Sequence, residues 1–485
     1  MANTGAGAGG EVADLGLRTV GSLLMARILG PAGLGSWLVA RTVAFDLGSV
    51  LARCGLDEAV LRFVARSHGR REPAHARGVV RSGLHWSLLT ALAAGVMLFA
   101  VAPAVGARVF KKPEVAQLMR ALAPSLLLWA PVVVLLAAVQ GLDRVAIRVA
   151  AQKIAFPGIQ AVVLGIALAA GLGMGGVVAA HYTGIIAMVI VAATAGLHAW
   201  RTSAGRGAGV CHRSELARFA APLALNELSM FAVLWLDILM LGAMSSRSET
   251  GVYGAAQRVT GLIALPLNAV NMMFSPVIAS LHGTGDRDGL AELFRVTARW
   301  VLFATIPLFA VVLYAGKEIL GLFGEGFQAG YPALVVLSAG KLVSSATGSV
   351  GYVLNMTGHQ RLNLLNSVLL CMINAVLNVL WISRWGAAGA AGAAALSLAL
   401  INALRVAQVR AVLGMGLVSR GYAVALLGAA LAFLVVTVFR GVAHGPLGVA
   451  ILSVAFIVVY AGTLARWGLN DADREIAAVA MRWVR

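Results

Sequence analysis

The stretch ARILGPAGLGSWLVARTVAFDLGSVLARCG, from Ala26 to Gly55, decides the fold class of this chain. Most of it is as apolar as a membrane span, and a span needs about 20 such residues. Three arginines and one aspartate interrupt it, namely Arg27, Arg41, Asp46 and Arg53. A charge at mid-helix costs about 2.5–3.5 kcal/mol on insertion scales. These side chains are therefore predicted to face water, one another or a charged cargo.

The whole chain shares the apolar character of this stretch. Of its 485 residues, 60% are hydrophobic and 12% are charged, whereas soluble domains are about 45–50% apolar and about 25% charged. Lipid is therefore the predicted solvent, and the fold class is an all-α polytopic membrane protein with fourteen spans. The predicted spans lie near residues 12–30, 34–55, 79–106, 118–140, 150–172, 175–199, 216–243, 251–281, 298–316, 330–355, 362–383, 386–413, 420–440 and 446–466.

The basic residues predict the orientation of these spans. Most lie in the loops after even-numbered spans, and cytoplasmic loops carry an excess of lysine and arginine. Both termini are therefore predicted to be cytoplasmic, in a bacterial inner membrane. The formal net charge of +18 is read as this topology signal, which also suits anionic lipid headgroups, and nucleic-acid binding is not expected. One opposite loop is an exception, with Arg108, Lys111 and Lys112.

An internal repeat divides the spans into two lobes. Similar positions recur at an offset near 215 residues, in the order Gly35 with Gly251, Arg81 and Trp86 with Arg295 and Trp300, and Gly141 and Arg144 with Gly358 and Arg361. The predicted lobes are residues 1–210 and 211–414, each with six spans of the same orientation, followed by two spans and a cytoplasmic tail in 415–485. Transporters commonly have such repeats, with the cargo site between them near the midplane.

Charged residues inside the spans are the candidate site. Arg18, Arg41, Arg258 and Lys341 lie deepest and are the predicted cargo contacts. Asp46, Glu227 and Asp237 are candidates for H⁺ or Na⁺ coupling or for pairing, and Arg27 and Arg53, near span ends, for pairing or anchoring. On an α-helix Arg41 and Asp46 would be about 140° apart. Asp46 is therefore predicted to pair with Arg18 or Arg27 of the neighbouring helix.

This excess of cations favours an anionic cargo. Arginine suits phosphate because its planar fork donates two parallel hydrogen bonds. No zinc-protease, nucleotide-loop or CxxC motif is present in the sequence, and no metal or organic cofactor is expected. The predicted outer loops are short, about 5–15 residues, so a membrane enzyme of glycan assembly is a weaker alternative.

The sequence around Ala26 resembles a known family. Ala26 to Pro31, then Gly33-Leu34-Gly35 and Asp46-Leu47-Gly48, is similar to the amino-terminal signature of the Wzx-type polysaccharide flippases, and Gly251-Val252-Tyr253 resembles the matching element of the second lobe. These flippases belong to the multidrug/oligosaccharidyl-lipid/polysaccharide exporter superfamily. The resemblance spans essentially the whole chain.

The resemblance implies a substrate and a mechanism. The cargo would be an undecaprenyl-diphosphate-linked oligosaccharide for surface polysaccharides such as O-antigen, lipopolysaccharide or exopolysaccharide, moved to the outer leaflet by alternating access. The family's cationic cavity would fall on Arg18, Arg41, Arg258 and Lys341. Polymerase and chain-length proteins are the partners it suggests. A lipid II flippase and a cation/drug antiporter of the same superfamily remain alternatives.

Overall fold

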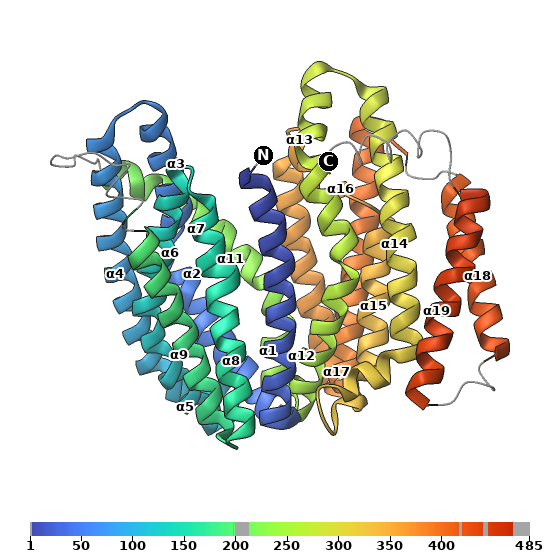
Figure 1. Ribbon diagram of the computed structural model, residues 1–485, viewed down its shortest axis with the longest axis horizontal. Coiled ribbons are helices and arrows are strands. Elements are labelled where there is room, and N and C mark those ends of the chain that lie inside the picture. Colours follow the sequence, from blue (N-terminus) through green and yellow to red (C-terminus); the bar gives the residue numbers. More distant parts are fainter. Residues whose placement is uncertain (1, 197, 199–212, 417–419, 440–444, 469–485) are drawn as a thin grey trace. The chain divides into compact units, whose positions relative to one another are not determined.

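The computed structural model describes residues 2–196, 198, 213–416, 420–439 and 445–468, and all regular elements in these ranges are helices (Figure 1). The chain forms two compact units, Met1–Gly254 (unit 1) and Ala255–Arg485 (unit 2). The predicted lobe boundary at residue 210 lies outside the described residues, as do five of the basic residues on which the predicted orientation depends: Arg201, Arg206, Arg474, Arg482 and Arg485. The two lobes and the orientation therefore stay predictions.

Unit 1 contains the amino-terminal helices. They are α1 (Ala2–Arg41), η1 (Thr42–Leu47), α2 (Gly48–Arg53), α3 (Leu56–Gly69), α4 (Pro73–Ala104), η2 (Val105–Val109), α5 (Pro113–Leu122), η3 (Ala123–Ser125), α6 (Leu126–Gly141), α7 (Val145–Val149), η4 (Ala150–Ala155), α8 (Phe156–Ala169), α9 (Gly173–Val191), η5 (Ala192–Gly196), α11 (Arg213–Met244) and the first part of α12 (Arg247–Ile263).

A glycine breaks α1 at the predicted turn between the first two spans. Gly30 has φ 62° and ψ −179°, a conformation that is essentially restricted to glycine, and Pro31 follows it. A second break follows α2, where Cys54 and Gly55 both have positive φ. The first two predicted spans are therefore separate helical segments.

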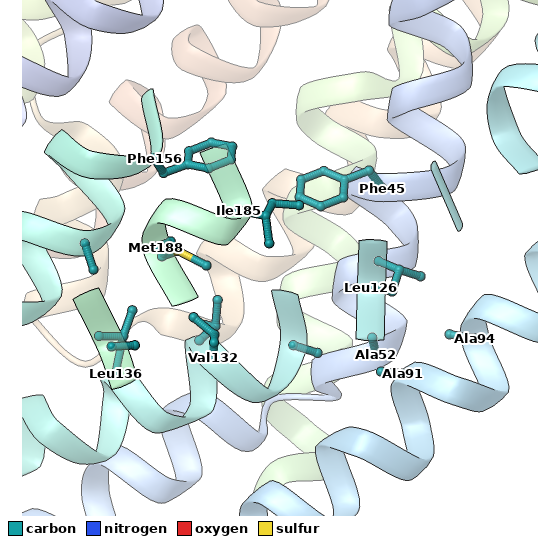
Figure 2. Close-up of a cluster of buried hydrophobic side chains, with 14 of the residues drawn as sticks. Phe45, Ala52, Ala91, Ala94, Leu126, Val132, Leu136, Phe156, Ile185 and Met188 are labelled. Atoms are coloured by element: carbon teal, nitrogen blue, oxygen red, sulfur yellow. The ribbon is translucent and has the colours of Figure 1, made fainter. Parts of the chain in front are cut away.

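An apolar core holds unit 1 together. Buried side chains of η1, α2, α4, α6, α8 and α9 form one cluster, in which Phe45, Leu126, Leu136, Ile185 and Met188 are at most 4% exposed. Figure 2 shows these side chains converging between the helices. Since Phe45 lies next to Asp46, this packing orients the segment that carries the candidate charges.

The segment after the second predicted span is a helix, where the sequence predicted a basic loop. In α3, Leu56, Val60, Phe63 and Val64 are buried in a second apolar cluster, with spacings of three and four residues. Arginines such as Arg66 occupy the exposed side. The apolar residues of this segment are thus spaced as on one face of a helix. The prediction of a loop was based on its arginines alone.

The exceptional basic loop has a structural partner. Nζ of Lys112 donates hydrogen bonds to the carbonyl oxygens of Gly242 (2.6 Å) and Ser245 (2.9 Å) at the end of α11. Glu114 pairs with Arg247 at the start of α12. Burial, and secondarily the positive charge of Arg247, lower the pKa of Lys112 from its ordinary value. This lysine therefore caps a helix, which explains its departure from the charge pattern.

Unit 2 contains the remaining helices. They are the rest of α12, α13 (Leu265–Thr284), α14 (Arg287–Gly321), η6 (Phe327–Gly330), α15 (Tyr331–Ala346), α16 (Val350–Met356), α17 (Gln360–Leu413), α18 (Arg420–Phe439), α19 (Gly445–Thr463) and η7 (Leu464–Gly468). The predicted span 251–281 is two helices, because the chain breaks at Ala264 and Pro266 starts the next helix. Proline is common at this position because it has no N–H group, and the N–H groups of the first helical turn have no partner within the helix.

The long α17 is two segments joined at Gly386, which has φ 51° and ψ −127°. Hydrogen bonds between Asn366 and Gln408, and between Asn374 and Ser397, show that the segments run antiparallel. This agrees with the predicted spans 362–383 and 386–413.

Span length and hydropathy agree with a polytopic membrane protein. Within the described residues, eight helical stretches are long and apolar enough to cross a membrane, and nine if the bent pair formed by Phe327–Ala346 and Val350–Met356 counts as one span. Two of the eight contain the breaks at Gly30 and Gly386, and two shorter apolar helices lie in α18 and α19. Helical segments thus occupy each of the fourteen predicted positions.

Candidate functional site

Arg18 is part of a small charged cluster in unit 1. Its Nε lies 2.5 Å from Oδ1 of Asp14, one turn earlier on α1, and Nζ of Lys153 lies 3.5 Å from the other oxygen of Asp14. Lys153 also contacts Glu11 at 3.2 Å. The charges of these two basic and two acidic side chains cancel, so Arg18 is not an isolated cation.

Arg41 and Asp46 form an ion pair, with 3.3 Å between Nη2 and Oδ1. The sequence predicted Arg18 or Arg27 as the partner of Asp46, whereas the ion pair seen at Asp46 is with Arg41, and Arg18 forms its own ion pair with Asp14. The reason is local: residues Thr42–Leu47 form a π-helical turn, which brings residues five apart together. On a regular α-helix these two side chains would diverge. Oδ2 of Asp46 is buried and has no hydrogen-bond partner among the described residues.

A chain of aromatic rings lies beneath both arginines. Phe156 contacts Trp129, and Trp129 contacts Phe45, with ring centroids 5.3 and 5.0 Å apart. The guanidinium of Arg18 lies 5.7 Å from the centre of Phe156, and that of Arg41 lies 5.9 Å from Phe45. At these distances a cation is attracted to the ring face. The rings therefore position both cations and link them through the core.

Arg53 joins three segments of unit 1. Its Nη1 lies 2.6 Å from Asp57 on α3, and its Nη2 lies 3.0 Å from Glu227 on α11. Asp57 is only 3% exposed, so the pair is well shielded from water. Two carboxylates share one guanidinium, which leaves the group with one net negative charge.

Asp237 also lies on α11, and it contacts a tyrosine. The hydroxyl of Tyr253 donates a hydrogen bond of 2.9 Å to Oδ2 of Asp237, and both residues are buried. This bond joins α11 to α12. Arg27 is on α1, between Gly30 and Arg18, and its side chain is exposed.

The predicted cations of unit 2 have a different setting. Arg258 on α12 and Lys341 on α15 are both partly buried. The described acidic residues of unit 2 lie at the ends of α14 or in the loops beside them: Asp286, Asp288, Glu292, Glu318 and Glu325. Consequently α13, α15, α16 and α17 contain no carboxylate side chain.

The sequence analysis missed a seam of amides on α17. Asn366 and Gln408 exchange two hydrogen bonds of 2.7 and 3.0 Å, and Asn378 donates to Asn374 at 2.9 Å. Such amides join helices within apolar surroundings. A signal existed, since asparagines recur at 363, 366, 374 and 378 on one helix.

Arg405 on the same helix was not among the predicted site residues, and it lies beside Gly351 and Asn363. Its Nε is buried and has no hydrogen-bond partner in the described parts of the chain. The missed partners in unit 1 are Asp14, Lys153 and Asp57. All three lie near the ends of predicted spans, where a charged residue is expected to reach water.

The geometry separates the two units chemically. In unit 1 the cations Arg18, Arg41 and Arg53 each contact a carboxylate, so buried charge is largely balanced. In unit 2 the helices α15–α17 carry only basic charged side chains. Among the described residues, no group of three His, Cys, Asp or Glu side chains is arranged to hold a metal ion.

The family-model comparison identifies the chain. A model described as "Polysaccharide biosynthesis protein" matches residues 1–282, more than half of the chain. The chain belongs to the polysaccharide biosynthesis protein family. A second model, MatE, matches residues 222–380.

Relatives of this family member have names that refer to flippases. It is 28% identical over 171 residues to "Probable low-salt glycan biosynthesis flippase Agl15" of Haloferax volcanii, which covers 35% of this chain and 36% of the relative. It is 31% identical over 188 residues to "Probable flippase AglR" of the same organism, covering 38% and 39%. The matched regions thus span less than half of each relative.

Solved structures support the fold. The lipid II flippase MurJ in an inward closed conformation has a TM-score of 0.74 at 12% identity, covering 94% of this chain and 97% of that one. An inward-facing multidrug resistance MATE family transporter of the MOP superfamily has a TM-score of 0.66 at 18% identity, covering 82% and 94%. At such identities the likeness concerns the fold alone.

Proposed function

We propose that this protein is a flippase that moves an undecaprenyl-diphosphate-linked oligosaccharide from the cytoplasmic to the outer leaflet of the bacterial inner membrane. The family match over residues 1–282 carries the proposal. The names of the two Haloferax relatives support the flippase activity. The product would be a surface polysaccharide, and a polymerase and chain-length proteins would act on the delivered cargo.

The mechanism we propose is alternating access between two lobes, residues 1–210 and 211–414, with both termini in the cytoplasm. The carrier diphosphate needs cationic partners, and Arg18, Arg41, Arg258 and Lys341 are the proposed contacts. In unit 1 the carboxylates that accompany the arginines would be displaced by the cargo or would hold the arginines in place. Asp46, Glu227 and Asp237 are the proposed candidates for H⁺ or Na⁺ coupling, since they lie in apolar helices.

Two other activities have specific support. The MurJ likeness favours a lipid II flippase, and the MatE match over residues 222–380 favours a cation/drug antiporter. An organic cation near α15–α17 would be repelled, because the charged side chains of these helices are all basic. Both flippase activities avoid this repulsion because their cargo is anionic.

A deletion strain tests the proposal. Loss of the protein should cause a lipid-linked glycan to accumulate on the cytoplasmic side, with drug resistance and peptidoglycan synthesis unchanged. Re-expression of the full chain should restore surface glycan. Loss of drug resistance without glycan accumulation would favour the antiporter, and arrest of peptidoglycan synthesis would favour the lipid II flippase.

A further inference from the structure

Arg405 differs from the arginines of unit 1 in its surroundings. It lies in the second segment of α17, inside the predicted span 386–413, and is partly buried. Its Nε has no hydrogen-bond partner in the described parts of unit 2. A buried donor without a partner costs about 1–3 kcal/mol, and more when it is charged. A ligand that accepts hydrogen bonds would remove this cost.

The helices α15, α16 and α17 supply no carboxylate to Arg405. The start of α14 packs in the same apolar cluster as Val406 and Val409 and carries Asp288 and Glu292, of which Glu292 pairs with Arg295. The second segment of α17 packs against its first segment and against α15, and α16 also packs on α17. These three helices contain no aspartate or glutamate, but five basic residues: Lys341, Arg361, Arg384, Arg405 and Arg410. The net charge on these three helices is therefore positive, which favours an anion.

A glycine leaves room beside the guanidinium. A β-carbon on Gly351 of α16 would stand 3.9 Å from Nη1 of Arg405 and 3.6 Å from Oδ1 of Asn363. Both polar groups therefore lie beside the α-carbon of Gly351, across a space that one β-carbon would fill in ordinary van der Waals contact. This space is here called the notch. Gly351, Asn355, Asn363 and Arg405 together are here named the Arg405 cluster.

The amide in this cluster can also serve an anion. Nδ2 of Asn363 donates to Oδ1 of Asn355 at 3.0 Å, and Oδ1 of Asn363 is buried without a hydrogen-bond partner in the described residues. If the side-chain amides of Asn363 and Asn355 both rotate by 180°, Nδ2 of Asn355 donates to Oδ1 of Asn363, so a hydrogen bond between them is kept. Asn363 then presents an N–H group to the notch, beside the guanidinium.

From this geometry we infer that the Arg405 cluster binds a phosphate-type oxyanion. Arginine donates parallel hydrogen bonds to two phosphate oxygens, and the amide supplies a third donor. Two sources can provide such an oxyanion: the diphosphate of a prenyl-linked cargo and the phosphate of an anionic membrane lipid. We assign the cargo diphosphate, an assignment that rests on the proposed function.

Binding of two lipids to the full-length protein in phosphatidylcholine nanodiscs tests this site. The probes are sugar-free undecaprenyl diphosphate and phosphatidylglycerol. Arg405→Ala should raise the dissociation constant for undecaprenyl diphosphate at least tenfold, and Arg405→Lys should raise it less because the charge remains without the fork. Arg410→Ala is the matched control, since Arg410 is exposed near the end of the same helix, and should change it less than twofold.

A second variant covers the case in which changes at Arg405 impair folding. Gly351→Val leaves the arginine intact but fills the notch, and should weaken the same binding at an unchanged melting temperature. Wild-type affinity for both lipids in folded Arg405→Ala, or in folded Gly351→Val, would overturn the site. If Arg405→Ala weakens only phosphatidylglycerol binding, the oxyanion site stands and the cargo assignment fails.

Translocation by the wild-type protein separates this inference from the proposed function. If proteoliposomes move a prenyl-diphosphate glycan and Arg405→Ala binds both lipids normally, the Arg405 site fails alone. If binding depends on Arg405 but the wild type moves no glycolipid, the oxyanion site stands and the flippase proposal fails.

Discussion

Gly35 and Gly251 pack against each other's helices in a reciprocal way. A β-carbon on Gly35 would overlap the carbonyl oxygen of Arg247 and stand 3.0 Å from the amide nitrogen of Gly251. A β-carbon on Gly251 would overlap the carbonyl oxygen of Pro31 and stand 3.0 Å from the nitrogen of Gly35. Each overlapping carbonyl lies four residues before a glycine. The contact is thus nearly symmetric between two positions that the sequence repeat also relates.

Alanine at either glycine should separate α1 from α12. Overpacking of this kind costs about 1–3 kcal/mol, and here the obstacle is rigid backbone. We expect Gly35→Ala and Gly251→Ala each to lower the melting temperature of the purified protein. Gly16→Ala on α1 and Gly261→Ala on α12 are matched controls, because a β-carbon there meets nothing within 4 Å. Equal melting temperatures for all four variants would contradict the close crossing.

Arg53 should be more costly to remove than either of its partners. Arg53→Ala leaves Asp57 and Glu227 together without a counter-charge, and breaking a buried pair in this way costs about 3–5 kcal/mol. We expect the lower end of this range, since Arg53 keeps some exposure. Glu227→Gln should cost less because Arg53 retains Asp57.

A combined variant tests this reasoning. In the background Arg53→Ala, adding Glu227→Gln should recover part of the lost melting temperature, because one of the two uncompensated charges is removed. Strictly additive losses would mean that the two residues do not interact. Arg66→Ala, an exposed change on α3, the helix that carries Asp57, is the control.

Lys112 should stabilise the junction between α11 and α12. Lys112→Ala removes two hydrogen bonds from the carbonyl oxygens of Gly242 and Ser245. Because the lysine is only half-buried, solvent screens the interaction, and a loss of about 1 kcal/mol is expected. Lys111→Ala, at the exposed neighbour, should leave the melting temperature unchanged. If both variants behave alike, the cap has no energetic role.

The same lysine predicts a pH dependence with a definite sign. Its pKa in the folded protein is below the ordinary value of about 10.4. At pH values between these two pKa values, the unfolded chain therefore binds more protons than the folded protein. Stability contributed by Lys112 therefore rises as pH increases through that interval, and is flat below it. The difference in melting temperature between wild type and Lys112→Ala should grow as the pH is raised toward 10.4. A difference that shrinks would contradict the lowered pKa.

Apolar run length predicted the helical positions because a bilayer imposes a minimum length on each span. Glycine and proline predicted the break at Gly30, since few residues adopt its backbone conformation. They did not predict the break at Ala264, because a proline such as Pro266 can either kink a helix or begin a new one. Length alone therefore joined α12 and α13.

The ion pairs were harder to predict, because pairing depends on helix geometry and on segments distant in sequence. The angle between Arg41 and Asp46 was calculated for an α-helix, and the π-helical turn changes it. Asp57 was not considered because it follows the predicted span end, and only packing of α3 brings it to Arg53. Arg405 meets Asn363 and Gly351 through three separate segments, and no spacing in the sequence shows this.

The pair of Arg41 and Asp46 allows a structural role to be separated from a role in transport. Asp46→Asn leaves the partly buried guanidinium of Arg41 without its counter-charge and should lower the melting temperature. The double variant Arg41→Met/Asp46→Asn removes both charges and should recover much of that loss, because replacing a buried pair by uncharged residues is often nearly neutral. If Arg41 also contacts the cargo diphosphate, this stable double variant should still fail to restore surface glycan in a deletion strain. Restored glycan with the double variant would show that Arg41 serves only its partner carboxylate, and the cationic contacts would then have to come from elsewhere in the chain.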